Sequence, residues 1–262
     1  MATYLDKIIS DHRAWAKSDT RRTGELLKIA LDSEPCLGFR EALIGPGVSI
    51  IAEIKRRSPS KGDLNPALDP VALAKSYEMH GASCISILTD EKYFSGSLAD
   101  LSNVRSAVRI PLLRKDFTIS ANDVLDAKIH GADAVLLIVS ALSGHELAEL
   151  YGISKEVGLD VLVEVHDEPE FVQAQDIGAD LIGVNQRDLT TFEVDPDKAL
   201  TLSTLFDAST VRVCESGIST TDQMRSLARM GYDAALIGET LVRSSDPGVS
   251  LAELIQAGMG DM

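Results

Sequence analysis

The chain has 262 residues, of which 45% are hydrophobic and 25% charged, a composition typical of a folded globular domain. Its formal net charge of −15 argues against non-specific binding to nucleic acid or to an anionic membrane surface. An anionic ligand must therefore be held by a local basic cluster, of which the segment Lys55–Lys61 is the densest. We expect a small-molecule ligand, with no nucleic-acid partner and no membrane partner.

The three cysteines, Cys36, Cys84 and Cys214, are odd in number and lack the spacing of a metal site. Cys84 and Cys214 lie in apolar, strand-like runs, where a free thiol usually serves as a small hydrophobic side chain. The N-terminus lacks the apolar core of a signal peptide, and no run of about 18 apolar residues is long enough to span a membrane. These features predict a reduced, cytoplasmic protein.

Residues 1–47 precede the first predicted strand. Leu5, Ile8, Ile9 and Trp15 follow a helical period, and Glu25–Ala30 predicts a second helix. This segment is too short to form a core of its own. We therefore expect residues 1–262 to form a single domain, with residues 1–47 as an N-terminal helical extension.

From residue 49 onward, apolar strand-like runs alternate with helical patterns. Strands are predicted at 49–55, 83–88, 110–115, 133–139, 160–166, 180–185, 211–215 and 234–238. Helices are predicted near 70–80, 98–108, 121–130, 143–157, 168–177, 196–206, 221–230 and 249–257. Local signals mark several helix ends: N-caps before proline at Asp69 and Asp195, a capping box at Ser143, and recurrent glycines suited to left-handed C-caps.

Alternating strands and helices of this number predict an α/β protein, a (β/α)₈ TIM barrel with an N-terminal helical extension. The alternative is a doubly wound open sheet. Such a sheet would carry a glycine-rich turn after its first strand, whereas this chain has Arg56-Arg-Ser-Pro59 there.

Charged and polar side chains stand at the carboxyl ends of several predicted strands, where a barrel of this type carries its active site. In chain order they are Glu53, Lys55, Lys115, Glu164, Asn185 and Glu215. Glutamates near lysines provide an ammonium donor and a carboxylate acceptor, which is what general acid–base catalysis requires. The alternative for the first strand is an edge strand that carries a solvated surface pair, Glu53 and Lys55.

Other chemistries have weaker support. No Cys–His or Ser–His pair stands at a strand end, so an acyl-enzyme mechanism is not indicated. His166 follows the fifth strand and could shuttle protons, although a surface histidine is the commoner case. The clustered carboxylates could bind Mg²⁺, but the adjacent lysines would compete with the ion, and we expect no metal.

Two glycine turns after the last strands predict an anion site. Ser216-Gly217 and Gly238-Glu239 each lead from a strand toward a helix. Glycine lets backbone N–H groups approach a phosphate, and phosphate often binds at this place in such barrels. Because a carboxylate is unfavourable beside a phosphate, the Glu239 side chain is expected to point away, leaving its backbone as the contact.

The ordered motifs from about Ser49 to Arg243 are Glu53-Ile-Lys55, Ser58-Pro-Ser-Lys-Gly62, Leu88-Thr-Asp-Glu-Lys-Tyr-Phe94, Arg114-Lys-Asp-Phe117, Leu136-Leu-Ile138, Glu164, Gly183-Val-Asn-Gln-Arg-Asp-Leu189, Glu215-Ser-Gly-Ile218 and Leu236-Ile-Gly238. Together they resemble the indole-3-glycerol phosphate synthase family of tryptophan biosynthesis, and residues 1–47 resemble that family's extension. The first two motifs are the most specific. Glu239 stands where some members carry serine, which weakens a side-chain phosphate contact there.

The resemblance implies a carboxy-lyase that cyclises 1-(2-carboxyphenylamino)-1-deoxyribulose 5-phosphate to indole-3-glycerol phosphate, with loss of CO₂ and water and without a cofactor. Lys115 is implied as the acid that protonates the developing alkoxide. Lys55, paired with Glu53, would bind the substrate carboxylate or phosphate and act as acid in the dehydration. Glu164 would be the partner acid or base in the later proton transfers.

The resemblance also implies a set of contacts around the lysines. Asn185, Glu215 and Ser216 would hold the lysines and the sugar hydroxyls, and Phe94 would pack on the aromatic ring of the substrate. The remaining implied contacts are Arg187 and Leu189 with the substrate, and Ser58, Gly217, Gly238 and the backbone of Glu239 with the phosphate.

Two other functions stay open. One is a Schiff-base aldolase or a sugar-phosphate isomerase on the same fold, with Lys115 as nucleophile. The other is an inactive phosphate-binding or interaction protein, which would be expected to lose the strand-end charges that this chain retains. We further expect a monomer or a weak homodimer, and an irregular loop at Arg56–Asp63 that closes over the substrate.

Overall fold

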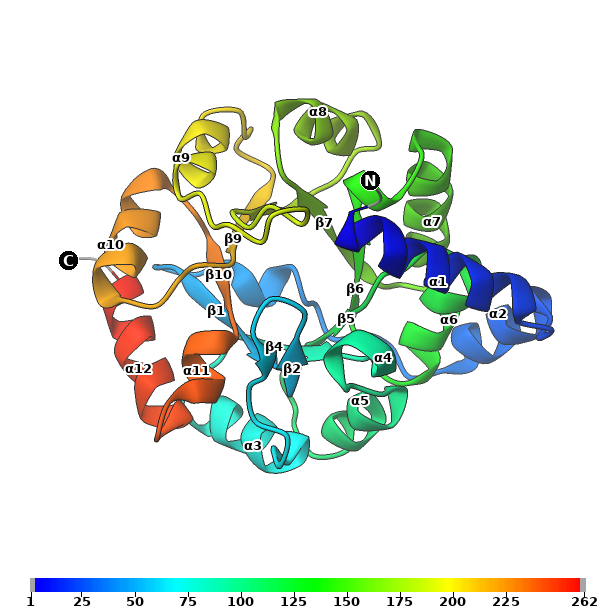
Figure 1. The fold of residues 1–262 in the computed structure, drawn as a ribbon, viewed down its shortest axis with the longest axis horizontal. Coiled ribbons are helices and arrows are strands. Elements are labelled where there is room, and N and C mark those ends of the chain that lie inside the picture. The colour runs from blue at the N-terminus through cyan, green and yellow to red at the C-terminus, as the bar shows by residue number, and fades with distance from the viewer. Residues whose placement is uncertain (1–2, 260–262) are drawn as a thin grey trace.

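Eight parallel strands form a closed barrel in the computed structural model, which describes residues 3–259 (Figure 1). The strands are β1 (Ser49–Ile54), β4 (Cys84–Leu88), β5 (Leu112–Lys115), β6 (Ala134–Ile138), β7 (Asp160–Val165), β8 (Leu181–Asn185), β9 (Val211–Glu215) and β10 (Ala234–Ile237). The barrel closes because β1 pairs with both β4 and β10. The predicted (β/α)₈ barrel is confirmed, and the open sheet is wrong.

The barrel strands are buried on both faces, as expected when helices cover parallel strands. Every residue of β4, β6 and β8 is buried. In β1 all residues after Ser49 are buried, and the strand has a hydrogen-bonded neighbour on each side. The edge-strand interpretation of β1 is therefore wrong.

Helices surround the barrel in the order that the sequence predicts (Figure 1). They are α3 (Pro70–Met79), α5 (Leu98–Arg105), α6 (Ala121–Ile129), α7 (Gly144–Glu156), α8 (Glu168–Asp176), α9 (Asp197–Ser203), α10 (Thr221–Met230) and α12 (Pro247–Gly258). Asp69 caps α3, and Ser143 opens a capping box on α7, as predicted. The glycines that end helices have φ between 74° and 91°, so the predicted left-handed caps are confirmed at Gly81, Gly131, Gly158, Gly178 and Gly231.

Several short elements differ from the prediction. The loop after β1 forms a small hairpin of β2 (Arg57–Ser58) and β3 (Gly62–Asp63), so the expectation of an irregular loop is wrong. The structure adds two short helices, α4 (Glu91–Phe94) and α11 (Glu239–Arg243), and two 3₁₀ turns, η1 (Glu41–Leu43) and η2 (Val139–Ala141). Helix α9 begins at Asp197 and ends at Ser203, although Asp195 still accepts a hydrogen bond from the Asp197 N–H at 3.0 Å.

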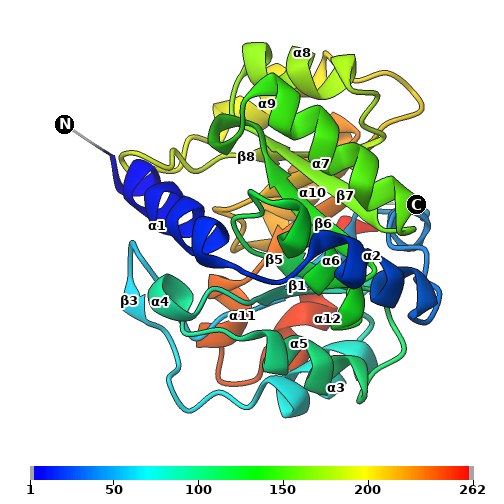
Figure 2. The same ribbon diagram turned by 90° about the vertical axis from the view of Figure 1, so that its right-hand side faces the viewer.

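The N-terminal residues cover both ends of the barrel. Helix α1 (Tyr4–Ser18) lies across the carboxyl ends of the strands (Figure 2), and α2 (Thr23–Asp32) lies beside α6. The following segment crosses the opposite end, where the Leu37 and Arg40 N–H groups donate to Asp133 and Asp160 at 2.6 and 3.0 Å. Phe39 is fully buried there. One end of the barrel is thus sealed, and the other is partly roofed by α1.

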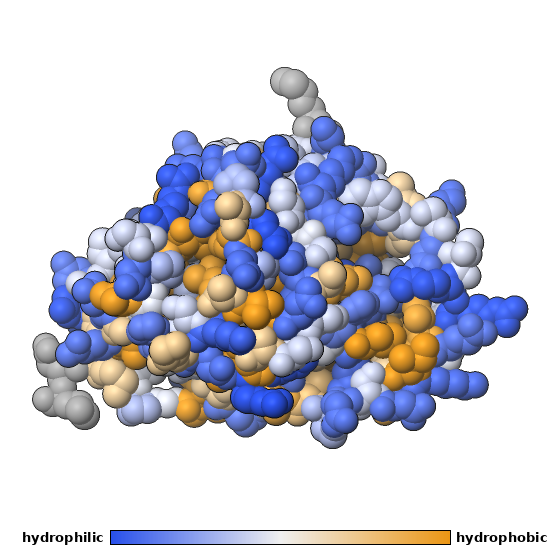
Figure 3. Space-filling model, turned by 90° about the horizontal axis from the view of Figure 1, so that it is seen from below, coloured by the Kyte–Doolittle hydropathy of each residue, from blue (hydrophilic) through white to orange (hydrophobic). Residues whose placement is uncertain are grey.

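The surface of the described residues carries scattered apolar side chains. Figure 3 shows hydrophobic patches separated by hydrophilic residues on one face. The large exposed apolar residues on helices are distributed over α1, α2, α3, α8, α9 and α12 and include Trp15, Ile29, Leu31, Met79, Val172, Leu200 and Val249. Within residues 3–259, none of the helices has the length and apolar character needed to cross a membrane.

Candidate active site

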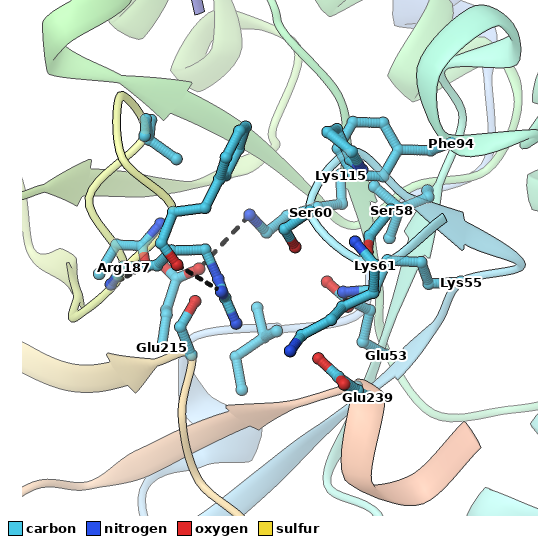
Figure 4. A pocket seen from close by; sticks show the side chains of 18 of the residues that line it. Glu53, Lys55, Ser58, Ser60, Lys61, Phe94, Lys115, Arg187, Glu215 and Glu239 are labelled. Atoms are coloured by element: carbon cyan, nitrogen blue, oxygen red, sulfur yellow. Dashed lines mark hydrogen bonds and ion pairs between the residues drawn. The ribbon is translucent and has the colours of Figure 1, made fainter. Parts of the chain in front are cut away.

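All predicted site residues line one cavity of about 720 Å³ at the carboxyl ends of the strands (Figure 4). They are Glu53, Lys55, Ser58, Phe94, Lys115, Glu164, Asn185, Arg187, Leu189, Glu215, Ser216, Gly217, Gly238 and Glu239. The cavity is large enough for a small ligand and is placed where barrel enzymes bind their substrates. The fold thus brings together side chains that lie far apart in the sequence.

Glu53 and Lys55 form an ion pair at the end of β1. Their side chains are only 6% and 17% exposed, so the interpretation as a solvated surface pair is wrong. Gly238 forms the wall behind the carboxylate, since a Cβ added there would lie 2.2 Å from Glu53 Oε1. The absence of a side chain at Gly238 therefore leaves space for the Glu53 carboxylate. It also leaves the Gly238 backbone open to the cavity.

Lys115 lies between two buried carboxylates. Its Nζ is 3.1 Å from Glu164 Oε2 and 3.4 Å from Glu215 Oε2. Burial lowers the pKa of Lys115, but the charges of Glu164, Glu215 and Glu53 outweigh burial and hold that pKa well above its usual range. Lys115 is therefore an ammonium group at neutral pH, a form that is not nucleophilic.

The two carboxylates beside Lys115 have opposite pKa shifts. Burial raises the pKa of Glu164, but Lys115, His166 and Asn185 outweigh it and hold that pKa below its usual range. Burial raises the pKa of Glu215 to about 8, since the attraction of Lys115 is offset by repulsion from Glu164 and Glu53. Glu164 is thus an anion, and Glu215 is largely a neutral acid at pH 7.

Hydrogen bonds from neighbouring strands orient Glu164. Asn185 Nδ2 donates to Glu164 Oε1 at 3.0 Å, and Asn185 Oδ1 in turn accepts the Arg187 N–H at 3.0 Å. His166 Nε2 lies 3.4 Å from the same Glu164 oxygen. The His166 side chain is only 11% exposed, so the interpretation of His166 as a surface histidine is wrong.

The two predicted glycine turns meet at one side of the cavity. Ser216 and Gly217 have φ of 66° and 75°, and a Cβ on Gly217 would lie 2.4 Å from Val194 Cγ1. Thr240 Oγ1 donates to the Ile218 carbonyl at 2.8 Å, which ties the turn after β10 to the turn after β9. The two turns that are predicted to contact an anion are therefore adjacent.

Glu239 does not turn away from the cavity, contrary to the prediction. Its Oε1 lies 3.4 Å from Arg243 Nε, one turn further along α11. This pair partly neutralises the carboxylate that would otherwise oppose an anion. Arg243 also lines the cavity, and the sequence analysis did not identify it.

The apolar wall contains residues that the sequence analysis missed. Phe94 has Phe117 beside it, with ring centroids 6.2 Å apart. The α1 residues Tyr4, Leu5 and Ile8 also line the cavity. Phe117 follows Lys115 by two positions and could have been found from its motif, whereas the place of α1 depends on contacts between distant segments.

Two predicted site residues near the rim of the cavity, Ser58 and Arg187, make hydrogen bonds within their own loops. Ser58 Oγ accepts the Lys61 N–H at 3.2 Å, which supports the β2–β3 hairpin. Arg187 Nη1 donates to the Phe192 carbonyl at 2.9 Å, an interaction drawn in Figure 4. Leu189 lies in the loop after β8 and lines the cavity. Pro59, Ser60 and Lys61 of the hairpin turn line it as well.

A cluster with metal-like spacing lies beneath α1. His12, Asp90 and Asp116 bring their ligand atoms within 4.8 Å of one another. His12 Nε2 is 3.0 Å from Asp90 Oδ2, and Asp116 also pairs with Arg114 at 3.0 Å. These contacts anchor α1 to the loops after β4 and β5, and we assign no metal to them.

The site is a cavity lined by lysine–glutamate pairs at the mouth of a (β/α)₈ barrel, next to backbone turns suited to an anion. This arrangement is that of a barrel enzyme acting on an anionic small molecule. Comparison with known proteins narrows this class. The family model described as indole-3-glycerol phosphate synthase matches residues 5–254. The chain belongs to this family.

Two relatives that match this chain over nearly their whole length have the same name as the family model. An indole-3-glycerol phosphate synthase from Mycobacterium ulcerans is 44% identical over 259 residues, covering 98% of this chain and 95% of the relative. One from Koribacter versatilis is 44% identical over 260 residues, covering 97% and 100%. The chain is thus a decarboxylating carbon–carbon lyase of tryptophan biosynthesis.

Solved structures of lower identity share the barrel fold alone. A 3-hexulose-6-phosphate synthase from Salmonella typhimurium has a TM-score of 0.66 at 14% identity and covers 80% of this chain and 98% of its own. A thiamine phosphate pyrophosphorylase from Pyrococcus furiosus has a TM-score of 0.62 at 17% identity and covers 83% and 96%.

Proposed function

We propose that the cavity cyclises 1-(2-carboxyphenylamino)-1-deoxyribulose 5-phosphate to indole-3-glycerol phosphate, with Lys115 as the proton donor in ring closure. The observation that carries this assignment is the position of Lys115 Nζ, which lies 3.1 Å from Glu164 Oε2 and 3.4 Å from Glu215 Oε2. Ring closure joins an aromatic carbon to the substrate ketone, whose oxygen gains a proton. A charged, buried donor at that oxygen lowers the barrier by proton transfer and by electrostatic stabilisation.

The later steps need an acid and a base. Loss of CO₂ leaves its electron pair with the ring system and restores its aromaticity. Loss of water then requires a proton on the leaving hydroxyl, which we assign to Lys55, and removal of a proton from the neighbouring carbon, which we assign to Glu164. Glu53 pairs with Lys55 and supports its ammonium form.

The remaining residues hold the substrate in this scheme. Phe94 packs on the aromatic ring, and Arg187 and Leu189 contact the substrate at the rim. Asn185, Glu215 and Ser216 hold the lysines and the sugar hydroxyls. The phosphate is assigned to Lys55, Ser58, Gly217, Gly238 and the backbone of Glu239.

The test is turnover of the named substrate by the purified protein, followed by the growth of indole fluorescence. Lys115→Ala should reduce kcat by about 10²–10⁴-fold. Lys155→Ala is the control, because Lys155 lies on the outer helix α7 and its side chain is 40% exposed. A Lys115→Ala protein within a fewfold of wild type, with an unchanged circular dichroism spectrum, would remove Lys115 from the mechanism.

Borohydride trapping addresses the Schiff-base alternative. An imine would require a neutral Lys115 amine, and the three nearby glutamates oppose deprotonation. We expect no covalent adduct with substrate in the presence of borohydride. An adduct at Lys115 would favour the hypothesis that the protein is an aldolase or an isomerase.

Inorganic phosphate tests the anion site. We predict competitive inhibition, because the turns at Gly217 and Gly238 would bind it in place of the substrate phosphate. The inhibition constant should rise in Arg243→Ala, whose guanidinium lines the same side of the cavity, and stay unchanged in Arg225→Ala on the outer helix α10. Non-competitive inhibition would place the phosphate elsewhere.

We further propose a cytoplasmic protein that acts without a cofactor, as a monomer or a weak homodimer. The three cysteines are free, which suits a reducing compartment. The exposed apolar residues are spread over several helices, which is unlike an obligate interface. A single domain of residues 1–262, with residues 1–47 as extension, is supported by Ala30 and Phe39, which belong to the same core as the barrel strands.

A further inference from the structure

His166 is a buried ionisable group beside the cavity that the mechanism above does not use. It follows β7 directly, and its side chain is 11% exposed. It is not among the residues that line the cavity, and Glu164 lies between its ring and Lys115. Any influence on catalysis must pass through its neighbours.

The start of α8 fixes the His166 ring. Asp167 caps this helix by accepting the Glu170 N–H at 2.9 Å. The Glu170 carboxylate turns back and accepts the His166 backbone N–H at 2.8 Å, with ring Nδ1 at 3.0 Å from the same oxygen. A carboxylate can only accept, so Nδ1 carries a proton.

The other ring nitrogen faces a second carboxylate. His166 Nε2 is buried without a hydrogen bond of good geometry, and Glu164 Oε1 lies 3.4 Å away. With Nδ1 protonated, a neutral ring would point a lone pair at this anion, which is repulsive. A second proton on Nε2 turns the contact into an attraction, so the geometry favours imidazolium.

We propose that His166, as an imidazolium, is a positioning residue that keeps Glu164 ionised and directs its Oε2 toward Lys115. Glu164 Oε1 takes the contacts from His166 and Asn185, which leaves Oε2 for Lys115 at 3.1 Å. This inference rests on the proposed role of Glu164 in proton transfer.

The groups that face His166 all favour its charged form. They are the carboxylates of Glu164 on β7, Glu170 on α8 and Asp188 in the loop after β8. The cation Lys115 does not face His166 directly, because it lies on the far side of Glu164. Burial lowers the pKa of His166, but Glu164 and Glu170 outweigh it and raise that pKa to about 10. The pKa of Asp188 is lowered by the Thr191 and Thr190 N–H groups and, more weakly, by charges that include His166.

The test is the dependence of kcat on pH, which reports ionisation in the enzyme–substrate complex. Without the imidazolium, Glu164 takes up a proton at higher pH. We therefore expect the acid limb of the kcat profile to move upward by about one pH unit in His166→Leu and His166→Gln. At neutral pH kcat should fall by about 10- to 100-fold in His166→Leu, and less in His166→Gln, whose amide can still donate to Glu164.

Three further variants complete the design. Glu170→Gln should move the acid limb in the same direction by a smaller amount, because it removes one of the charges that favour imidazolium. His145→Leu, at an exposed position on α7, should leave the profile unchanged. Glu164→Gln should be inactive.

The outcomes separate this inference from the proposed function. An unmoved acid limb in the His166 variants, with Glu164→Gln inactive, overturns the positioning role alone. An active Glu164→Gln overturns the role of Glu164 and, with it, the basis of this inference. If His166→Leu does not fold, His166→Gln still decides, because its amide can donate to Glu164 while the positive charge is removed.

Discussion

At the scale of single residues, two glycines determine where the Glu53 and Glu215 carboxylates lie. A Cβ on Gly183 would lie 2.1 Å from Glu215 Oε1, and one on Gly238 would lie 2.2 Å from Glu53 Oε1. Both distances are far inside van der Waals contact. A glycine in each of β8 and the turn after β10 therefore creates the space for a carboxylate from a neighbouring strand.

Gly183→Ala tests this packing argument. The added methyl should displace Glu215 from Lys115 and lower kcat by about 10- to 100-fold. Gly152→Ala is the matched control, because an added Cβ on this α7 residue meets nothing within 4 Å. It should keep kcat and raise the free energy of unfolding by about 0.5–1 kcal/mol. Equal kinetics in the two variants would contradict the argument.

Glu215 should also make stability depend on pH. Its pKa rises from 4.5 to about 8 on folding, so between these values the folded chain binds more protons at this group than the unfolded chain. Its contribution to stability is present below pH 4.5 and is lost as the pH rises through 8. His166 acts in the same direction between 6.5 and about 10.

Glu215→Gln removes this dependence at one position. We predict that the melting temperature of Glu215→Gln increases relative to that of wild type as the pH rises from 5 to 9. The increase should be about 2–4 °C for each kcal/mol of unfolding free energy that wild type loses over this range. Glu253→Gln, at an exposed position on α12, should show a constant difference. A difference in melting temperature between Glu215→Gln and wild type that stays constant from pH 5 to 9 would contradict this prediction, because it would mean that folding does not raise the pKa of Glu215.

At the scale of elements, sequence patterns located the long units and missed the short ones. β1 was expected at 49–55 and runs from Ser49 to Ile54, because buried, β-branched residues and flanking glycines mark it. Helices α4 and α11 span four and five residues, too few for a helical period to show. Their positions depend on the tertiary contacts of the loops that contain them.

The candidate site was predictable where a side chain follows a strand. The barrel fixes the direction of each strand end, so Lys115, Glu164 and Glu215 could be placed in one mouth from the sequence. The contribution of α1 could not, because its anchor joins His12 to Asp90, 78 positions away. His166 was misjudged for a different reason: its ring is held by side-chain contacts with Glu170, four positions further on, and with Glu164, which the periodicity of the sequence does not show.

The β2–β3 hairpin is the element expected to move. Its base is fixed, since Arg56 donates to Asp100 at 2.7 and 3.0 Å, while Pro59, Ser60 and Lys61 line the cavity above Lys55. We predict that a tight product analogue slows hydrogen exchange of residues 57–63. Pro59→Gly should lower kcat by about two- to fivefold, because glycine adds freedom to the open loop.

Two results together would make the hairpin a static rim. They are equal hydrogen exchange with and without the analogue, and an unchanged kcat in Pro59→Gly. Exchange of α3, on the outside of the barrel, serves as the internal reference.

At the scale of the whole molecule, the fold concentrates a few cations inside a strongly acidic protein. The net charge of −15 repels anions at long range, yet Lys55, Lys61, Lys115, Arg187 and Arg243 line the same cavity. Substrate capture therefore depends on short-range contacts rather than on steering by the overall field. The closed barrel makes this possible, because all of its strands point their carboxyl ends at one mouth.

The central claim is that Lys115 acts in ring closure and Lys55 in dehydration. Since CO₂ leaves between these steps, single-turnover reactions with carboxyl-labelled substrate and excess enzyme can separate them by counting CO₂ and indole. We predict that Lys115→Ala releases neither, and that Lys55→Ala releases about one equivalent of CO₂ well before indole appears. Release of CO₂ at the wild-type rate by Lys115→Ala, with indole formation blocked, would contradict this assignment.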